Sequence, residues 1–151
     1  MDFALRPARP EDCPGLTTLC LRSKAHWGYD ADFMARCRPY LTISETSLGA
    51  GWVVLAETGD LPLGTAEVTV AGTVADLDKI FVAPEALGHG IGRALMAWVM
   101  DCARAHGATR LEALADPNAV PFYEAMGGQQ QGWALSEATP GRRLPRMVIA
   151  L

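Results

Sequence analysis

The sequence lacks any run of eighteen uninterrupted apolar residues, the length that a membrane-spanning helix needs. Its first residues, MDFALRPARPED, lack the basic segment, apolar run and small-residue cleavage site of a secretory leader. Lysine and arginine number 13 against 17 aspartates and glutamates, and the sequence has no cluster of basic residues of the kind that binds the phosphate backbone of a nucleic acid. We therefore expect a cytoplasmic protein with neither a membrane nor a nucleic acid as partner.

Cysteine and histidine are too scarce and too scattered to predict a metal site or a disulfide framework. The 4 cysteines show no C-x-x-C spacing, which favours buried, reduced thiols. They are Cys13, Cys20, Cys37 and Cys102. The 3 histidines are equally dispersed along the chain. We expect no metal ligand set.

The composition is that of one folded domain. Of the 151 residues, 50% are hydrophobic and 20% charged, which is ordinary for a globular protein and too apolar for a disordered one. No internal repeat, low-complexity block or linker divides the chain, so residues 1–151 are treated as a single domain.

Helix signals occur at four places. Pro10 followed by two acids starts a helix that should end near residues 23–28, and Asp30 can cap a second helix that Pro39 should stop. Residues 90–106 carry apolar side chains at spacings of three and four, which predicts the strongest helix. A short helix is expected over 120–126. Residues 42–51 are expected to form only a polar connection.

Strands are predicted at residues 3–7, 51–57, 63–71, 74–82, 110–115, 129–135 and 144–151. Short turns join the second, third and fourth of these, which predicts an antiparallel meander at the centre of the chain. The order of helices, meander, crossover helix and closing strands favours one α+β domain.

The glycines between the strand at 74–82 and the helix at 90–106 predict a binding turn for phosphate. Gly88, Gly90 and Gly92 leave backbone amides unobstructed at a helix N-terminus, where the helix dipole favours anions. Glycine in a helical turn costs about 1 kcal/mol relative to alanine, so these residues need a reason. A dinucleotide-binding pattern would need glycine in place of Arg93, and a P-loop would need lysine followed by serine or threonine.

Two motifs give the chain a family resemblance. The run GHGIGRAL (residues 88–95), after the strand LDKIFVAPE, resembles the acetyl-CoA signature of the GCN5-related N-acetyltransferase (GNAT) family. The run DPNAVPFYEAMGG (116–128) resembles that family's second cofactor motif, in the same order and at the usual separation. The resemblance implies a mixed, mostly antiparallel central sheet flanked by helices, and acetyl-CoA as the acyl donor.

The resemblance also implies the residues that hold the cofactor. Main-chain groups at Ile80 and Val82 would pair with the pantetheine arm as an added strand would. Leu87 stands where the family usually has glutamine or arginine, so backbone amides would do the holding; His89 or Arg93 could add charge, or Arg93 could be a solvated helix residue. The full expected set is Ile80, Phe81, Val82, Leu87, Gly88, His89, Gly90, Ile91, Gly92, Arg93, Asn118, Phe122 and Tyr123.

Three residues are candidates for the chemistry. Tyr123 matches the family's general acid, which protonates the leaving thiolate; the alternative is that it packs beside Phe122. Glu67 is the first candidate for the general base and Asp78 the second. The alternative for Glu67 is a place on the solvent-facing side of a half-covered sheet. No cysteine lies in a nucleophile motif, which favours direct attack on the thioester.

The resemblance implies that the acceptor site lies between the first two helices. His26, Trp27 and Tyr29 could wall an amine site there, or they could form a packed aromatic corner with one surface histidine. The expected function is acetylation of a small-molecule amine. The alternatives are a module that senses acetyl-CoA or CoA without turnover, and a protein or peptide acetyltransferase. A homodimer through the C-terminal strand is also possible.

Overall fold

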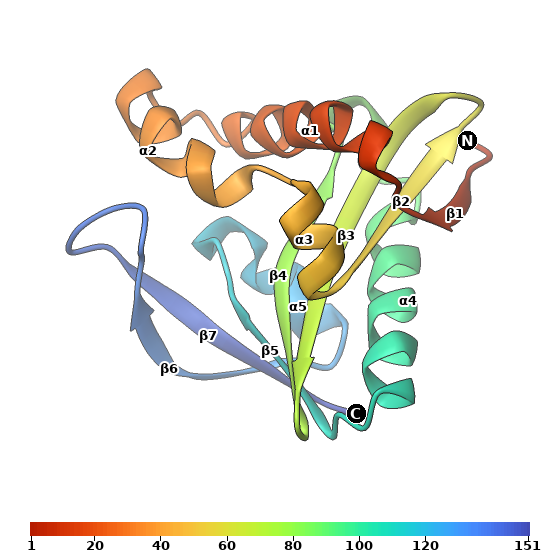
Figure 1. The fold of residues 1–151 in the computed structure, drawn as a ribbon. Coiled ribbons are helices and arrows are strands. Elements are labelled where there is room, and N and C mark those ends of the chain that lie inside the picture. The colour runs from red at the N-terminus through yellow and green to blue at the C-terminus, as the bar shows by residue number, and fades with distance from the viewer.

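The computed structural model describes all 151 residues as one sheet flanked by helices on both faces (Figure 1). The strand order is β1-β2-β3-β4-β5-β7-β6, and only β4 and β5 are parallel. The strands are β1 (Ala4–Pro7), β2 (Trp52–Thr58), β3 (Leu61–Ala71), β4 (Val74–Val82), β5 (Arg110–Leu114), β6 (Gln129–Leu135) and β7 (Arg143–Ala150). The helices are α1 (Cys13–Ala25), α2 (Ala31–Leu41), α3 (Glu45–Ala50), α4 (Ile91–Ala105) and α5 (Val120–Ala125). The predicted α+β class and mostly antiparallel sheet are confirmed.

The core lies on both faces of the sheet, and β2 shows how the sequence divides it. Val54 and Ala56 belong to the larger cluster, which includes the buried face of α4. Val53 and Leu55 belong to the smaller cluster, which includes α1 and α2. Because successive side chains of a strand point to opposite faces, an apolar run serves both clusters at once.

Two local predictions are wrong. The helix α2 continues through Pro39 to Leu41, so the proline costs one intrahelical hydrogen bond without ending the helix, and the Thr42 hydroxyl donates to the carbonyl of Arg38 at 2.8 Å just beyond its end. Within the expected polar connection lies the short helix α3, which starts at a reciprocal cap between Ser44 and Ser47.

The C-terminal strand forms where it was predicted along the chain, but it is not an edge of the sheet. β7 lies between β5 and β6, so both of its edges are already paired within the chain. The edges of the sheet are β1 and β6. Edge-to-edge pairing of β7 with a second copy is therefore excluded, and the homodimer stays a prediction.

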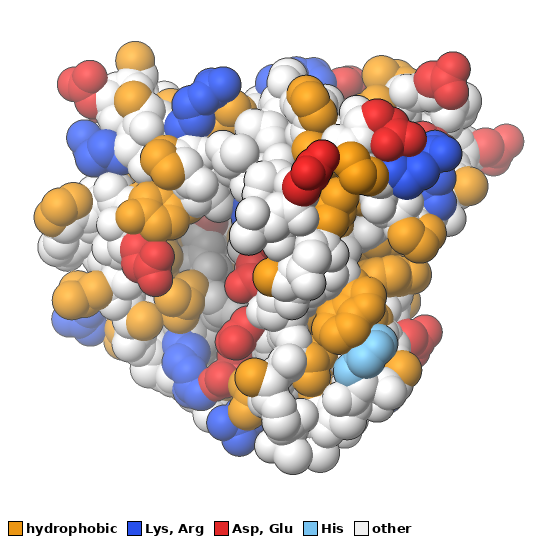
Figure 2. Space-filling model, viewed as in Figure 1, with side chains coloured by type: hydrophobic (Ala, Val, Ile, Leu, Met, Phe, Trp, Pro, Cys, Tyr) orange, Lys and Arg blue, Asp and Glu red, His pale blue; other side chains and the backbone are white.

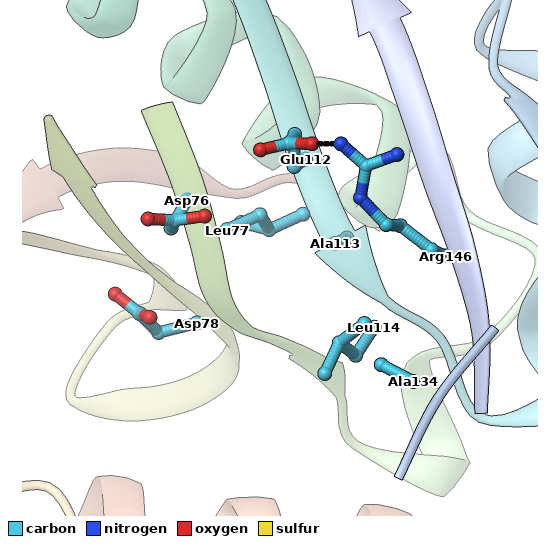
Figure 3. Close-up of a pocket in the computed structure, with 8 residues that line it drawn as sticks. All are labelled: Asp76, Leu77, Asp78, Glu112, Ala113, Leu114, Ala134 and Arg146. Carbon is cyan, nitrogen blue, oxygen red and sulfur yellow. Dashed lines mark ion pairs between the residues drawn. The ribbon is translucent and has the colours of Figure 1, made fainter. Parts of the chain in front are cut away.

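The parallel strands β4 and β5 pair over a short stretch and then part. Their register runs only from Val74 opposite Arg110 to Asp76 opposite Glu112. Beyond it, a β-bulge makes Asp78 the extra residue of β4, since Glu67 faces Lys79 and Val68 faces Leu77. The surface is hollowed at this place (Figure 2), and Figure 3 shows side chains of β4 and β5 on opposite sides of the opening.

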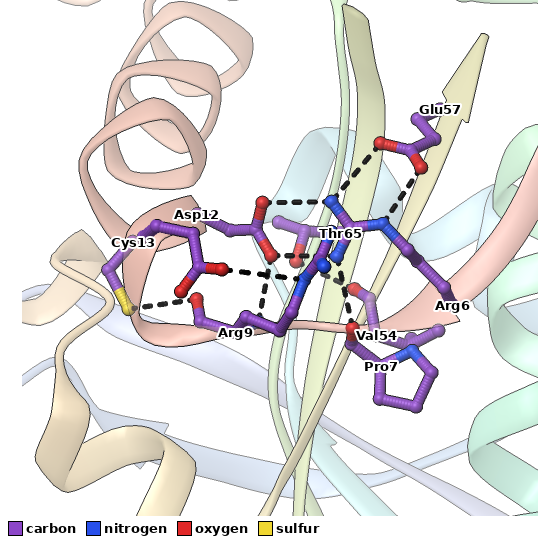
Figure 4. A network of polar contacts seen from close by, with 9 residues as sticks. Arg6, Pro7, Arg9, Asp12, Cys13, Val54, Glu57 and Thr65 are labelled. Carbon is purple, nitrogen blue, oxygen red and sulfur yellow. Dashed lines mark hydrogen bonds and ion pairs between the residues drawn. The ribbon is translucent and has the colours of Figure 1, made fainter. Parts of the chain in front are cut away.

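A polar network at the other end of the sheet ties β1 to β2 and to the start of α1 (Figure 4). The Arg6 guanidinium donates to both carboxylate oxygens of Asp12, at 2.8 and 2.9 Å, and to Glu57 at 2.8 Å. Asp12 also accepts from the amide of Arg9 at 2.7 Å. The hydrogen bonds from Arg6 lower the pKa of the Asp12 carboxyl to about 2.

We expect this pair to make folding sensitive to acid. A folded-state pKa below the unfolded value adds stability that is complete above the unfolded pKa of 3.8 and is lost as the pH falls through about 2. The contribution is about 1–2 kcal/mol. Urea unfolding across this range should show a shallower loss of stability in Asp12→Asn than in the wild type. The exposed neighbour variant Glu11→Gln should follow the wild type; parallel curves for all three proteins would contradict the assignment.

Candidate active site

A cleft of about 640 Å³ opens where β4 and β5 part. Its walls come from β4, from the turn before α4, from α5 and the segment before it, from the α1–α2 region, and from the loop between β6 and β7. A second cavity of about 410 Å³ adjoins it and shares Leu77, Asp78 and Leu114 with it. Most of the sequence-predicted site residues line this cleft.

The predicted phosphate turn has the geometry of an anion cradle. The amides from Gly88 to Arg93 have no hydrogen-bond partner in the protein, and Gly90, the residue just before α4, provides no side-chain cap. Gly88 and Gly90 both have φ +79°, a backbone conformation that residues with a side chain rarely adopt. Gly92 has another reason: a Cβ there would lie 3.0 Å from the Phe122 ring. Free amides that converge at a helix N-terminus fit a phosphate group.

Most of the predicted cofactor residues line this one cleft. They are Ile80, Phe81, Val82, Leu87, Gly88, Gly90, Ile91, Gly92, Arg93, Asn118, Phe122 and Tyr123. His89 is exposed and lies outside the lining. Leu87 is 49% exposed at the cleft, so an apolar side chain occupies the start of the turn. Arg93 lines the cleft and makes no ion pair within the protein.

Tyr123 is almost entirely enclosed but faces the cleft. It is 6% exposed, it packs edge-on against Phe122 at 5.5 Å, and its hydroxyl forms no hydrogen bond within the protein. Burial raises the pKa of this phenol well above its usual value, and the charge of Asp116 acts in the same direction. The hydroxyl therefore keeps its proton at neutral pH and is free to donate it.

Glu67 is buried, so the interpretation of a solvent-facing side chain is wrong. The residue is 5% exposed, and its carboxylate accepts from Lys79 Nζ at 2.6 Å across the β3–β4 pair. β3 is covered on both faces from Leu63 to Val68, which removes the solvated side that the alternation suggested. Lys79 lines the cleft, whereas Glu67 does not.

Asp78 is the carboxylate that faces open space. It lies at the bulge of β4, lines both cavities, and accepts from the Thr69 hydroxyl at 2.9 Å. The side chain is accessible to solvent, but desolvation within the cleft raises its pKa to about 6, with help from the charge of Glu67. In Figure 3 it stands on the same strand as Asp76, across from the ion pair of Glu112 with Arg146.

A cluster around Asp116 closes one side of the cleft. The Asp116 carboxylate accepts from Lys24 at 2.6 Å, from the Tyr29 hydroxyl at 2.7 Å and from the Asn118 side chain at 2.9 Å. Arg142 in turn donates to the Tyr29 hydroxyl at 2.9 Å. Burial alone would raise the pKa of Asp116, but the hydrogen bonds from Lys24 and Tyr29 outweigh it and lower the pKa.

The predicted acceptor loop is only partly at the cleft. Trp27 lines it and is 49% exposed. Tyr29 stands behind the lining, stacked on Phe33 at 4.0 Å, and its hydroxyl is held by Asp116. His26 is exposed and lies outside the cleft. The sequence did not reveal Lys24, Asp116 or Arg142 as a group, because they are far apart along the chain and share no motif.

The sequence matches the Acetyltransferase (GNAT) family over residues 21–128, so the chain belongs to this family of acetyltransferases. No match was found among curated proteins. No helix of the structure has both the length and the apolarity that crossing a membrane requires.

Solved structures of low sequence identity share the fold. A GCN5-related N-acetyltransferase from Rhodopseudomonas palustris has TM-score 0.79 and 22% identity, over 98% of this chain and 95% of that one. The PaiA N-acetyltransferase from Thermoplasma acidophilum, in complex with coenzyme A, has TM-score 0.75 and 16% identity over 100% of both chains. The ribosomal-protein-S18-alanine N-acetyltransferase from Escherichia coli has TM-score 0.73 and 18% identity, over 99% and 94%.

Proposed function

We propose that this protein transfers the acetyl group of acetyl-CoA to a small-molecule amine by direct attack on the thioester. The observation that carries the proposal is the convergence on one cleft of the free amides at 88–93, the unpaired stretch of β4 and the Tyr123 hydroxyl. Similar folds have been solved with coenzyme A or acetyl-CoA, which supports the same donor here. The ion pairs of Asp116 with Lys24 and Arg142 join three segments of the cleft wall, and we take this enclosure of one side to favour a small acceptor over a protein surface.

The residues present fit this cofactor. The amides from Gly88 to Gly92 would hold the pyrophosphate, and Arg93 would add a positive charge. The free backbone groups of Ile80 and Val82 would pair with the pantetheine arm, and Asn118 would contact it from the other wall. The bound cofactor supplies the activated acetyl group.

Two side chains would move the protons. Asp78 would take the proton of the acceptor's ammonium group, because its carboxylate faces the cleft and has an oxygen that Thr69 does not occupy. Tyr123 would give its proton to the departing thiolate. We assign to Glu67 the role of holding Lys79, since its carboxylate is already bonded at 2.6 Å and lies outside the lining.

The pH dependence tests the base. With Asp78 as base, kcat/KM should rise as the pH increases through about 6, where this carboxyl loses its proton. Asp78→Asn should remove this step and lower kcat about 10²-fold. Asp76→Asn, on the same strand, should keep both the step and the rate. A step that persists in Asp78→Asn would transfer the role to another group.

The function itself is tested by following CoA release from acetyl-CoA in the presence of amines, polyamines, amino acids and peptides. Amine-dependent release establishes the transferase. Cofactor binding measured in parallel by calorimetry separates the alternatives: tight binding without release by any amine would favour a sensor of acetyl-CoA, and release with peptides alone would favour a peptide acetyltransferase.

A further inference from the structure

The cluster around Asp116 carries more positive than negative charge. Its bonded members are the cations Lys24 and Arg142 and the single carboxylate of Asp116. The side chains of Lys24, Asp116 and Arg142 are only 12%, 10% and 20% exposed. Tyr29 adds no negative charge, because burial and its bond to Asp116 raise the pKa of its phenol. A partly buried cluster with one cation in excess is costly unless an anion joins it.

Arg142 has donors to spare. Its Nη2 atom reaches the Tyr29 hydroxyl at 2.9 Å and lies 3.7 Å from Asp116, whereas its Nε and Nη1 atoms have no partner in the protein. Both nitrogens are accessible from outside the protein, and Arg142 lines the cleft. Nη2 carries two N–H groups and the bond to Tyr29 uses one of them, so the other remains beside a free N–H of Nε or of Nη1. Such a pair of N–H groups binds a carboxylate with two hydrogen bonds.

The guanidinium is also held in place before any ligand arrives. It lies over the rings of Phe33, at 4.8 Å, and Tyr29, at 5.3 Å, which are stacked on one another at 4.0 Å. Lys24 lies over the same Tyr29 ring at 5.3 Å. Arg36 lies over the Phe33 ring at 6.0 Å, so the aromatic pair is contacted by three cations, of which Arg142 and Lys24 line the cleft. Fixed donors lose less conformational entropy when a ligand binds them.

We propose, resting on the function proposed above, that the acceptor carries an anionic group, a carboxylate in the first place, and that Arg142 with Lys24 beside it binds this group. The remaining carboxylates of the cleft suit the other end of such a molecule. Asp78 and Glu137 line the cleft outside the cluster, and they attract an ammonium group. The substrate class is thus a zwitterion such as an amino acid.

The test compares acceptors that differ only in the anionic group. Leucine, phenylalanine and glutamate are each assayed beside the corresponding α-carboxamide and the amine that lacks the α-carboxyl group. We expect kcat/KM to be at least about 10-fold higher for the acids. The amide's amine is less basic and more often neutral, so a preference for the acid does not come from a more available nucleophile.

Variants assign the preference to the residue. Arg142→Gln should raise the KM of the acids about 10–100-fold, should leave the KM of acetyl-CoA within about twofold, and should abolish the preference over the amides. Arg142→Lys should keep part of the preference. The control is Arg143→Gln, because Arg143 is the adjacent residue, rests on Trp133 and lies outside the cleft; it should behave as the wild type.

Three outcomes would overturn the proposal. They are equal use of acids and amides by the wild type, an effect of Arg142→Gln on the KM of acetyl-CoA alone, which would assign the cations to the cofactor, and equal effects of Arg142→Gln and Arg143→Gln. Calorimetric binding of the same acids and amides to the CoA-bound protein keeps the test independent of turnover. Tighter, Arg142-dependent binding of the acids without turnover would reject the transferase and uphold the anion site; binding without preference would reject the anion site.

Discussion

Replacement of Tyr123 by phenylalanine is expected to lower kcat about 10²–10³-fold while the protein stays fully folded. The hydroxyl faces the cleft and has no partner within the protein, so its removal takes away the proposed proton donor and no structural hydrogen bond. Loss of an unpartnered, nearly buried polar group is neutral or stabilising, so the melting temperature should be unchanged or slightly higher. The measurements are steady-state kinetics, thermal unfolding and CoA binding.

This combination of results separates chemistry from packing. If Tyr123 only packs beside Phe122, the phenylalanine ring keeps that contact and kcat changes less than about threefold. If the hydroxyl holds the cofactor, the dissociation constant of CoA rises with the loss of rate. A general acid is indicated only where kcat falls while CoA binding and stability do not.

Gly90→Ala is expected to weaken CoA binding by at least about 10-fold. Gly90 has φ +79° at the start of α4, and an alanine there costs about 1–2 kcal/mol or turns the free amides away from one another. Either response damages the cradle that would hold the pyrophosphate. CoA titration by calorimetry gives the dissociation constant, and thermal unfolding gives the cost to the fold.

A matched glycine controls for the backbone strain. Gly59, in the β2–β3 turn, has φ +57°, and a Cβ would meet nothing within 4 Å at either glycine. Gly59→Ala should therefore lose a similar amount of stability but bind CoA as the wild type does. Equal CoA affinity in both variants would show that the turn at 88–93 does not hold the cofactor.

The sequence predicted the parts of the site that lie close together along the chain. The glycine turn, the strand before it and Tyr123 are local motifs, and the structure places all of them at one cleft. Helix and strand boundaries fell within a few residues, except where a proline was tolerated in a last turn and where a reciprocal serine cap began a short helix.

What could not be predicted depends on contacts between distant segments. The alternation of Glu67 with apolar neighbours is the same for a solvated face as for a buried ion pair, and only the packing of α1 and α4 against β3 decides between them. Lys24, Asp116 and Arg142 meet because the end of α1, the segment after β5 and the loop between β6 and β7 converge at one point of the fold. No pattern within any of these three segments indicates the convergence.

The sheet consists mechanically of two plates, β1–β4 and β5–β7–β6, which are hinged where Val74–Asp76 pair with Arg110–Glu112. The ion pair of Lys24 with Asp116 fastens the same two plates at the opposite end, since Lys24 belongs to α1 and Asp116 follows β5. Hinge and clasp together set the width of the gap between the plates. The width of this opening therefore depends on a contact between charges as well as on the pairing of the strands.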